Sequence, residues 1–331
     1  MRAFVTGGTG FVGANLVRLL LAENYEVVAL ARSKAKAKNL EGLAVEIVEA
    51  DLTDPGLVEK MRGCQVLFHA AAHYSLWQAD RDLLYRSNVL GTRNILACAQ
   101  KAGIERTVYT SSVAAIGVAE GVADETYQSP PDKLIGAYKQ SKYYAEQEAN
   151  QAVKAGQDVV IVNPTTPVGP YDIKPTPTGE IILRFLRRQM PAYIDTAGLN
   201  FVDVGDVVHG HLLALEKGKS GERYILGHQN LSLKDFLGLL AELTGLEAPS
   251  FAVPAWLPLG VAWFDEQVLG AFGKQPEIPL DGVRMAAEPM YYSPAKAIRE
   301  LGLPQTSLSI ALKEAISWFR INGYVRGSHG S

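Results

Sequence analysis

The sequence predicts an α/β fold in which a doubly wound parallel sheet is followed by a smaller, mostly helical lobe. Two observations support this prediction. Short runs of β-branched residues alternate with helical patterns through the first half of the chain, and a glycine-rich turn follows the first run. The 331 residues, 47% hydrophobic and 20% charged, are enough for one large core and a smaller second one.

The alternation defines the elements in order. Strands are expected near residues 2–6, 26–31, 44–49, 65–69, 106–111 and 158–163, and helices near 11–23, 54–62, 80–102 and 137–155. This order is typical of right-handed βαβ units, whose parallel sheet is covered on both faces. Because ligands of such sheets bind at the carboxyl ends of the strands, the residues that follow each strand are the candidates for function.

The pattern changes after residue 163. Five prolines, too many for a helix or a central strand, follow at Pro164, Pro167, Pro170, Pro175 and Pro177. Helical patterns return at 179–189, 205–217, 232–244, 255–272, 293–301 and 307–321. We therefore expect a first domain over 1–163, with 204–228 packing back on it, a lobe from 164–203 and 229–326, and a tail at 327–331.

Charge and cysteine content exclude several classes of protein. The net charge of −3 argues against a nucleic-acid partner. Cys64 and Cys98 are too few and too far apart for a disulfide framework, which favours the cytoplasm. Met1 leads directly into an apolar strand without a signal peptide, and the apolar stretch 253–264 is too short for a transmembrane segment.

The turn after the first strand contains Gly7, Gly10 and Gly13 at three-residue spacing. Gly7 suits a tight turn, Gly10 lets the backbone approach a pyrophosphate, and Gly13 lets the next helix lie close to the sheet. The N-terminus of that helix offers free N–H groups to phosphates. A Rossmann-type dinucleotide site is therefore predicted, with a merely structural loop as the alternative. Its contacts are expected at Gly7, Thr9, Gly10, Phe11, Val12 and Gly13.

The end of the second strand bears on the choice of cofactor. It carries no carboxylate for the ribose 2′-hydroxyl of NAD(H), and Arg32 stands there, followed by Lys34 and Lys36. These cations suit the 2′-phosphate of NADP(H), which we favour, although a solvated basic turn is the alternative and NAD(H) stays open.

Two further strand ends contribute candidates. Asp51 and Leu52 close the third strand, where Asp51 could reach the adenine edge or could cap a helix that begins near Thr53. His69 ends the fourth strand and is expected to be a core histidine, with no metal site. The small residues that follow it, Ala70, Ala71 and Ala72, allow the cofactor to approach closely.

Tyr138 and Lys142 are four residues apart, so on a helix they share one face. A phenol with a pKa near ~10 exchanges protons poorly at neutral pH, and a neighbouring ammonium ion lowers that pKa. Lys142 could also hold the nicotinamide ribose. The fifth strand ends at Thr110, Ser111 and Ser112, where a serine can orient a substrate carbonyl toward Tyr138 or can simply satisfy backbone groups.

These motifs, in this order, resemble the extended short-chain dehydrogenases/reductases, over nearly the whole chain. Within that superfamily the sequence is most similar to the dihydroflavonol 4-reductase-like branch, close to bacterial proteins labelled hopanoid-associated sugar epimerases. The resemblance rests on Thr6–Gly13, Asp51–Leu52, His69–Ala72, Asn88–Thr92, Thr110–Ser112 and Tyr138–Lys142, and for the narrower match on Val168–Pro170 and Ile173–Gly179.

The resemblance implies roles for single residues. Ser112 would be the catalytic serine with Ser111 beside it, Tyr138 the general acid of ketone reduction, Lys142 the ribose-binding residue that tunes Tyr138, and Asn88 a support. The segment that includes Pro164, Thr165 and Val168 would border the nicotinamide. It also implies either a monomer or a homodimer formed through the helices at 80–102 and 137–155.

Two departures from the resemblance bear on the substrate. Leu199, Asn200 and Phe201 stand where sugar-nucleotide epimerases usually carry Arg-Asp-Phe, so a nucleotide diphosphate loses its anchor. A largely apolar pocket could be lined by aromatic residues and one histidine, although ordinary packing is the alternative for each of them. These residues are His73, Tyr74, Trp77, Tyr171, Tyr193, Trp256 and Trp263.

The leading hypothesis is NAD(P)H-dependent reduction of a bulky, apolar or aromatic ketone, or oxidation of the secondary alcohol. A sugar-nucleotide epimerase or dehydratase with tightly held NAD is the second hypothesis. A dinucleotide-binding regulator without turnover is the third, and the intact Ser–Tyr–Lys set argues against it.

Overall fold

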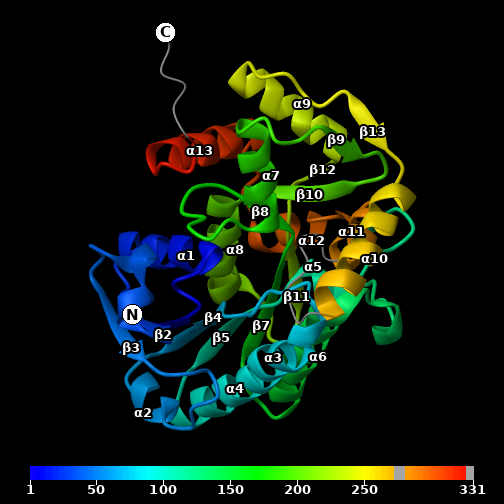
Figure 1. The fold of residues 1–331 in the computed structure, drawn as a ribbon. Coiled ribbons are helices and arrows are strands. Elements are labelled where there is room, and N and C mark those ends of the chain that lie inside the picture. The colour runs from blue at the N-terminus through cyan, green and yellow to red at the C-terminus, as the bar shows by residue number, and fades with distance from the viewer. Residues whose placement is uncertain (272–279, 326–331) are drawn as a thin grey trace.

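The computed structural model describes residues 1–271 and 280–325, and its centre is a seven-stranded, fully parallel sheet (Figure 1). The spatial order is β11-β7-β5-β4-β1-β2-β3. The strands are β1 (Arg2–Thr6), β2 (Glu26–Ala31), β3 (Val45–Glu49), β4 (Val66–His69), β5 (Arg106–Thr110), β7 (Val159–Pro164) and β11 (Arg223–Leu226). The predicted doubly wound sheet is confirmed, and β11 extends the six expected strands.

Helices cover both faces of the sheet because successive strand residues point to opposite sides. On one face, Ala3 and Val5 of β1 pack in a cluster with α1 (Phe11–Ala22), α8 (Val204–Lys217) and α12 (Ala295–Leu301). On the other, Phe4 packs toward α2 (Leu57–Met61) and α4 (Gly91–Ala102), and β5 and β7 pack on α6 (Gly136–Lys154). Figure 1 shows these two layers.

The connection between β4 and β5 differs from the single helix expected over 80–102. It consists of the 3₁₀ turn η3 (Gln78–Asp80), the short helix α3 (Arg81–Leu84), the π-helix η4 (Tyr85–Leu90) and α4. A π-helix accommodates one extra residue per turn and is frequent at functional sites. Hydrophobic spacing alone does not distinguish it from an α-helix, so the sequence could not predict it.

The lobe lies above the sheet in Figure 1 and surrounds a second, three-stranded sheet that was not predicted. Its strands are β8 (Thr166–Val168), β10 (Gly198–Asp203) and β12 (Gln229–Ser232), and its helices are α7 (Pro177–Leu186), α9 (Leu233–Thr244) and α13 (Leu308–Ile321). Phe201 of β10 stacks on Phe236 of α9 at 4.1 Å between ring centroids. Pro167 is tolerated in β8 because β8 is an edge strand.

Smaller elements complete the structure. The pairs β9 (Ala192–Ile194) with β13 (Phe251–Val253) and β6 (Val122–Ala123) with β14 (Tyr291–Tyr292) are parallel. The other helices of the described residues are α5 (Val113–Ile116), η1 (Lys34–Lys36), η2 (Lys38–Leu40), η5 (Pro131–Lys133), α10 (Trp256–Ala271) and α11 (Leu280–Ala286). Of these, only α10 was predicted. Helix α8 packs on α1, as expected for 204–228, but the domain boundaries themselves stay a prediction.

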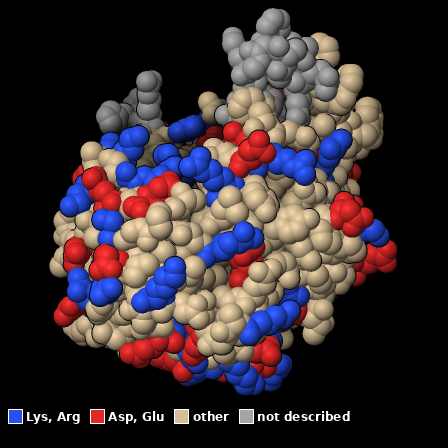
Figure 2. Space-filling model, turned by 90° about the horizontal axis from the view of Figure 1, so that it is seen from below, with Lys and Arg blue, Asp and Glu red and all other residues tan. Residues whose placement is uncertain are grey.

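The surface carries charges of both signs. Figure 2 shows Lys and Arg interspersed with Asp and Glu over the face that it displays. Within residues 1–271 and 280–325, no helix combines the length and the apolar character needed to cross a membrane.

The turn between β1 and α1 is packed without spare room. Gly7 adopts a φ of +73°, and a Cβ there would lie 2.6 Å from both the Ala70 carbonyl carbon and the Ala71 nitrogen. A Cβ on Gly13 would overlap the Gly7 carbonyl oxygen. Helix α1 therefore packs directly on the turn, and the turn packs on the residues that follow β4. Gly13 was expected to allow close contact between the helix and the sheet, whereas here it allows contact with the turn itself.

This packing predicts opposite effects for two glycine-to-alanine changes in helices. Gly13→Ala should lower the free energy of unfolding by about 1–3 kcal/mol through overpacking. Gly238→Ala in α9, where a Cβ meets nothing within 4 Å, should raise it by about 0.5–1 kcal/mol. Urea denaturation of both variants checks the pair, and equal effects would contradict the packing described here.

Candidate active site

The glycine turn and the end of β4 form a backbone-lined surface at the carboxyl ends of the strands. Gly10, the N-cap of α1, is exposed and has no side-chain cap, so the first N–H groups of α1 lack intrahelical partners. Phe11 and Val12 are half-buried, and Ala72 is exposed at the rim. The Asn39 amide donates to the carbonyls of Thr9 at 3.2 Å and Tyr171 at 3.3 Å, which ties the lobe to the turn.

Asp51 does not cap a helix. Its carboxylate accepts hydrogen bonds from the Thr53 backbone nitrogen at 3.0 Å and hydroxyl at 2.7 Å, whereas α2 begins at Leu57 with Gly56 as its N-cap. The capping alternative is thus wrong, because the Asp51–Thr53 turn precedes the helix. These bonds to Thr53 lower the pKa of Asp51, and the positive charges of Arg86 and Arg32 lower it further.

Arg32 is exposed at the end of β2 and contributes positive charge near Asp51. Arg86, exposed on η4, adds a second cation to this region that the sequence analysis missed. Leu52 lies against Gly91 at the start of α4, and its carbonyl accepts a bond from Asn94 at 2.8 Å. Two exposed arginines therefore lie near Asp51, where the adenosine end of the cofactor is predicted.

His69 is a core histidine, as expected. Its Nδ1 lies 2.6 Å from the Thr6 hydroxyl and its Nε2 3.0 Å from the Thr92 hydroxyl. Burial lowers its pKa to about 3, so the ring is neutral. These contacts join β4 to β1 and α4 directly beneath Ala70–Ala72.

Tyr138 lies in the first turn of α6. Its ring meets that of Tyr74 edge-on at 4.7 Å between centroids. Burial raises the pKa of Tyr138 to about 12, and a hydrogen bond with the Ser112 hydroxyl partly offsets this effect. The direction is opposite to the lowering expected from Lys142, because burial outweighs the other influences on the phenol.

Lys142 is buried one turn further along α6. Its ammonium group donates to the Thr110 carbonyl at 3.0 Å and lies 5.4 Å from the Tyr109 ring centroid. Burial lowers the pKa of Lys142 to about 8, against the opposing influence of Glu146. The helix spacing therefore brings Tyr138 and Lys142 to the same strand end, where each has its own partner.

The two serines have different surroundings. The Ser111 hydroxyl donates to the Glu146 carboxylate at 2.5 Å and is fully buried. The Ser112 hydroxyl accepts the Ala114 backbone N–H at 3.1 Å as N-cap of α5, and it also contacts Tyr138. The geometry thus favours Ser112 as the serine that faces the phenol. Its hydroxyl also satisfies a backbone N–H group, which is the role that the alternative interpretation gave to these serines.

Asn88, on the π-helix, holds the loop after β4 against α6. Its amide accepts from the His73 nitrogen at 2.7 Å and donates to the His73 carbonyl at 2.9 Å and the Ser141 hydroxyl at 2.9 Å. Among the described residues, the buried Nε2 of His73 has no hydrogen-bond partner. Asn88 therefore positions the loop that carries His73 and Tyr74 beside Tyr138.

Thr110 has a partner that sequence reasoning missed. Its hydroxyl donates to Nε2 of His211 at 2.9 Å, and Nδ1 of His211 donates to the Val207 carbonyl at 2.7 Å. Burial lowers the pKa of His211 to about 4. The only available signal was that His211 falls on the buried face of a predicted helix.

Strand β7, which follows α6, ends one residue beyond the predicted position. Pro164 ends β7 and is buried, and the Thr165 nitrogen donates to the Leu226 carbonyl at 3.1 Å. Val168 is buried in the lobe core. The segment therefore passes from the main sheet to the lobe beside β11.

The aromatic residues predicted to line one pocket have different surroundings. Tyr74 alone is seen against Tyr138, whereas Tyr171 lies 3.7 Å from the Arg18 guanidinium and 6.1 Å from the Trp318 ring. Tyr193 packs on the lobe core, Trp77 is half-buried at the start of η3, and Trp256 and Trp263 are 70% and 57% exposed on α10. The contacts do not test whether these residues line one substrate pocket, which stays a prediction.

Comparison with known proteins gives consistent matches. The model of the NAD dependent epimerase/dehydratase family matches residues 3–227. The chain is 64% identical over 329 residues to "Putative dihydroflavonol 4-reductase" of Synechocystis sp., covering 98% of this chain and 96% of the relative. It is 36% identical to "Sterol demethylase protein B" of Methylococcus capsulatus, over 98% of this chain and 100% of the relative.

A solved structure agrees over the same length. The dTDP-glucose 4,6-dehydratase from Streptomyces venezuelae, crystallised with NAD bound, superposes with a TM-score of 0.79 at 26% identity. The match covers 98% of this chain and 99% of the dehydratase.

The buried histidines predict acid sensitivity. A histidine whose folded pKa lies below its unfolded value of ~6.5 stabilises the fold fully above that pH, and this stability is lost as pH falls toward the folded value. For His211, with a folded pKa of about 4, the loss is about 2 kcal/mol at pH 5. His211→Asn should therefore reduce the slope of unfolding free energy against pH below pH 6.5.

His209→Asn is the matched control, since His209 lies on the same helix and is exposed. Its slope should equal that of the parent protein. Urea denaturation between pH 5 and 7.5 measures all three proteins, and an unchanged slope in His211→Asn would refute the neutral buried histidine.

Proposed function

The chain belongs to the NAD dependent epimerase/dehydratase family as an NAD(P)-dependent oxidoreductase of the extended short-chain dehydrogenase/reductase type, and we propose that it reduces a bulky apolar or aromatic ketone with Tyr138 as proton donor. The observation that carries the proposal is the contact between the Ser112 hydroxyl and the Tyr138 phenol, one helical turn from the buried Lys142 at the end of β5. A protonated phenol is the form that ketone reduction requires.

The residues at the glycine turn fit a dinucleotide. Gly10, the N-cap of α1, is exposed and offers no side-chain cap, so the first N–H groups of α1 are open to phosphate oxygens. We propose that Gly7–Gly13, Asp51, Leu52 and Ala70–Ala72 hold the cofactor, that Lys142 holds the nicotinamide ribose, and that Arg32 favours NADP(H). When bound, the nicotinamide supplies the hydride.

The protein groups divide the remaining work. Ser112 donates a hydrogen bond to the substrate carbonyl and orients its oxygen toward Tyr138. Tyr138 transfers its proton to that oxygen as the alcohol forms, and solvent later returns a proton to the phenolate. The ammonium group of Lys142 lowers the energy of that phenolate, which burial would otherwise make costly.

Several observations favour an apolar substrate. Tyr74 presents an aromatic ring beside Tyr138, and the adjacent His73 carries a buried Nε2 that has no hydrogen-bond partner among the described residues. The names of the relatives, a dihydroflavonol 4-reductase and a sterol demethylase protein, each refer to ring systems with large apolar surfaces. We propose that Tyr74 and His73 contact such a substrate.

Nucleotide-sugar epimerisation is the competing function. It is supported by the similarity to the solved dehydratase structure with bound NAD. Leu199, which takes the place of the arginine expected in those enzymes, packs against the lobe core. A hydrocarbon side chain there offers no charge to a diphosphate. Purified protein that retains NAD and shows no net cofactor turnover would support the epimerase instead.

Tyr138→Phe tests the proposed chemistry. It should lower ketone-dependent NADPH oxidation by about 10²–10⁴-fold while leaving NADPH binding intact, because only the transferable proton is removed. The assay follows NADPH absorbance with dihydroquercetin, cholestan-3-one and 4-nitroacetophenone as ketones. Tyr144→Phe, which changes an exposed tyrosine of the same helix, should retain full activity. Undiminished turnover in Tyr138→Phe would refute the assignment.

Arg32→Ala tests cofactor preference. Loss of a charge-assisted bond to the 2′-phosphate should reduce kcat/KM for NADPH about tenfold or more and leave that for NADH unchanged. Arg62→Ala, an exposed arginine paired with Glu59, is the control and should change neither value. An equal loss of kcat/KM with both cofactors would show that Arg32 does not distinguish the 2′-phosphate of NADPH.

A further inference from the structure

Glu146 is a buried carboxylate that the proposed chemistry does not use. It lies on α6 one turn beyond Lys142 and is 2% exposed. Its oxygens accept hydrogen bonds from the Ser111 hydroxyl at 2.5 Å, the Asn163 amide at 2.9 Å and the Arg223 guanidinium at 3.1 Å. A buried charge is costly unless it is paired in this way, so the partners indicate an ionised carboxylate.

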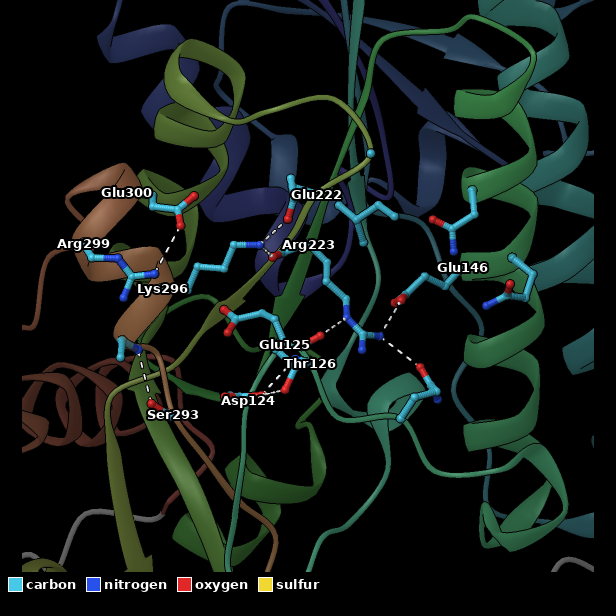
Figure 3. Close-up of a pocket in the computed structure, with 16 residues that line it drawn as sticks. Asp124, Glu125, Thr126, Glu146, Glu222, Arg223, Ser293, Lys296, Arg299 and Glu300 are labelled. Atoms are coloured by element: carbon cyan, nitrogen blue, oxygen red, sulfur yellow. Dashed lines mark hydrogen bonds and ion pairs between the residues drawn. The ribbon is translucent and has the colours of Figure 1, made fainter.

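The Arg223 side of Glu146 faces a polar pocket. Figure 3 shows Arg223 reaching from β11 toward Glu146 on α6. The same guanidinium donates to the carbonyls of Glu125 at 2.8 Å and Tyr127 at 2.6 Å and to the Gln128 amide oxygen at 3.0 Å. The pocket measures about 520 Å³, and neither Ser112, Tyr138 nor Lys142 lines it. Glu146 thus separates this pocket from the catalytic side of the sheet.

On the other side, two hydrogen-bond paths connect Glu146 to Ser111 and Ser112, which together form the serine segment. One is the direct bond from Ser111. The other passes through Asn163, whose amide nitrogen donates both to Glu146 and, at 3.0 Å, to the Ser112 carbonyl. The carboxylate therefore fixes the side chain of one serine and the backbone of the next.

The charge of Glu146 affects the ammonium form of Lys142, because few other charged groups among the described residues lie around that lysine. The titratable groups that face it are Tyr138 and Glu146 on α6, Tyr109 on β5 and the neutral His69 on β4. Of these, only Glu146 carries a negative charge at neutral pH, and it opposes the effect of burial on the ammonium group. Around Glu146 itself stand Lys142, Tyr109 on β5 and Arg223 on β11.

Arg223 offsets this charge only in part. It binds the carboxylate oxygen Oε1, while Ser111 and Asn163 bind Oε2. The ion pair consequently has its positive end in the pocket and its negative end toward the serine segment and α6.

We propose that Glu146 is a positioning residue, whose carboxylate fixes the Ser111–Ser112 segment and supplies the negative charge that keeps Lys142 an ammonium ion, with Arg223 holding it from the pocket. Its effect on turnover rests on the function proposed above, whereas its effect on Lys142 does not. Two separate measurements therefore test the two parts.

The first measurement needs no substrate. The intact protein is labelled with acetic anhydride over a pH range, and peptide mass spectrometry gives the titration midpoint of Lys142. Glu146→Gln should lower that midpoint by about one pH unit or more, because a carboxylate one helical turn away favours the ammonium form. Lys139, also buried on α6 but next to Met290, is the internal reference and should not shift.

Glu148→Gln is the matched control. Glu148 is buried on the same helix and pairs with Arg93 at 2.7 Å, away from the serine segment. It should leave the Lys142 midpoint unchanged. A shift of equal size in both variants, or none in Glu146→Gln, would overturn the electrostatic part of the proposal.

The second measurement is the pH profile of kcat with whichever ketone of the panel is reduced. In Glu146→Gln the alkaline limb should move to lower pH by the same amount, because the ammonium form is lost earlier as pH rises. Glu146→Asp keeps the charge and should keep the limb while lowering kcat. Ser111→Ala should lower kcat severalfold without moving the limb.

The outcomes separate the two hypotheses. Normal kcat and an unmoved limb in Glu146→Gln would overturn the positioning role even if Tyr138→Phe is inactive. The converse result is a shifted Lys142 midpoint in Glu146→Gln together with full turnover in Tyr138→Phe. That result would support the electrostatic link between Glu146 and Lys142 and would overturn the proposed function. If Glu146→Gln fails to fold, Glu146→Asp and Ser111→Ala still decide the role, and parental kcat in both would overturn it.

Discussion

Helix α6 carries charged side chains into the interior, and each of them needs a fixed partner there. The Lys142 ammonium group finds the Thr110 carbonyl, and the Glu146 carboxylate finds Ser111. Both partners belong to one strand end, so burial of these charges locks α6 to β5 at the point where ligands of parallel sheets bind. Loss of one of these hydrogen bonds would leave a buried charged group short of a partner, which typically costs about 1–3 kcal/mol. The same bonds that hold the helix therefore set the geometry of the site.

The main sheet could be predicted because its signals are local. The runs that form β1, β2 and β7 are continuous apolar segments, as expected for strands buried on both faces. The lobe sheet has no such signal, since β10 pairs with strands far away along the chain and β8 contains a proline. The π-helix was missed for a related reason, because its extra residue changes the register of hydrogen bonds without changing the residue pattern.

In the candidate site, too, features with a local sequence signal could be predicted and features without one could not. Glycines at a turn, hydroxyls at a strand end and a Tyr–Lys pair at helical spacing are short patterns that a sequence displays directly. Glu146, Arg223 and His211 are not, because each acts through a residue from a distant segment. The pKa of Tyr138 could not be predicted either. Spacing showed that Lys142 shares its face of the helix, but the degree of burial, which dominates the shift, is a property of the folded chain.

The direction of that shift bears on the proton transfer proposed for Tyr138. Burial stabilises the neutral forms of both the phenol and the amine, raising the pKa of Tyr138 and lowering that of Lys142. A protonated phenol can donate at once, whereas a base would first have to be made against the cost of burial. The ammonium form of Lys142 reduces that cost after proton transfer, and the carboxylate of Glu146 maintains the ammonium form. A charge introduced on α6 two turns from Tyr138 thus determines how readily the phenolate is tolerated.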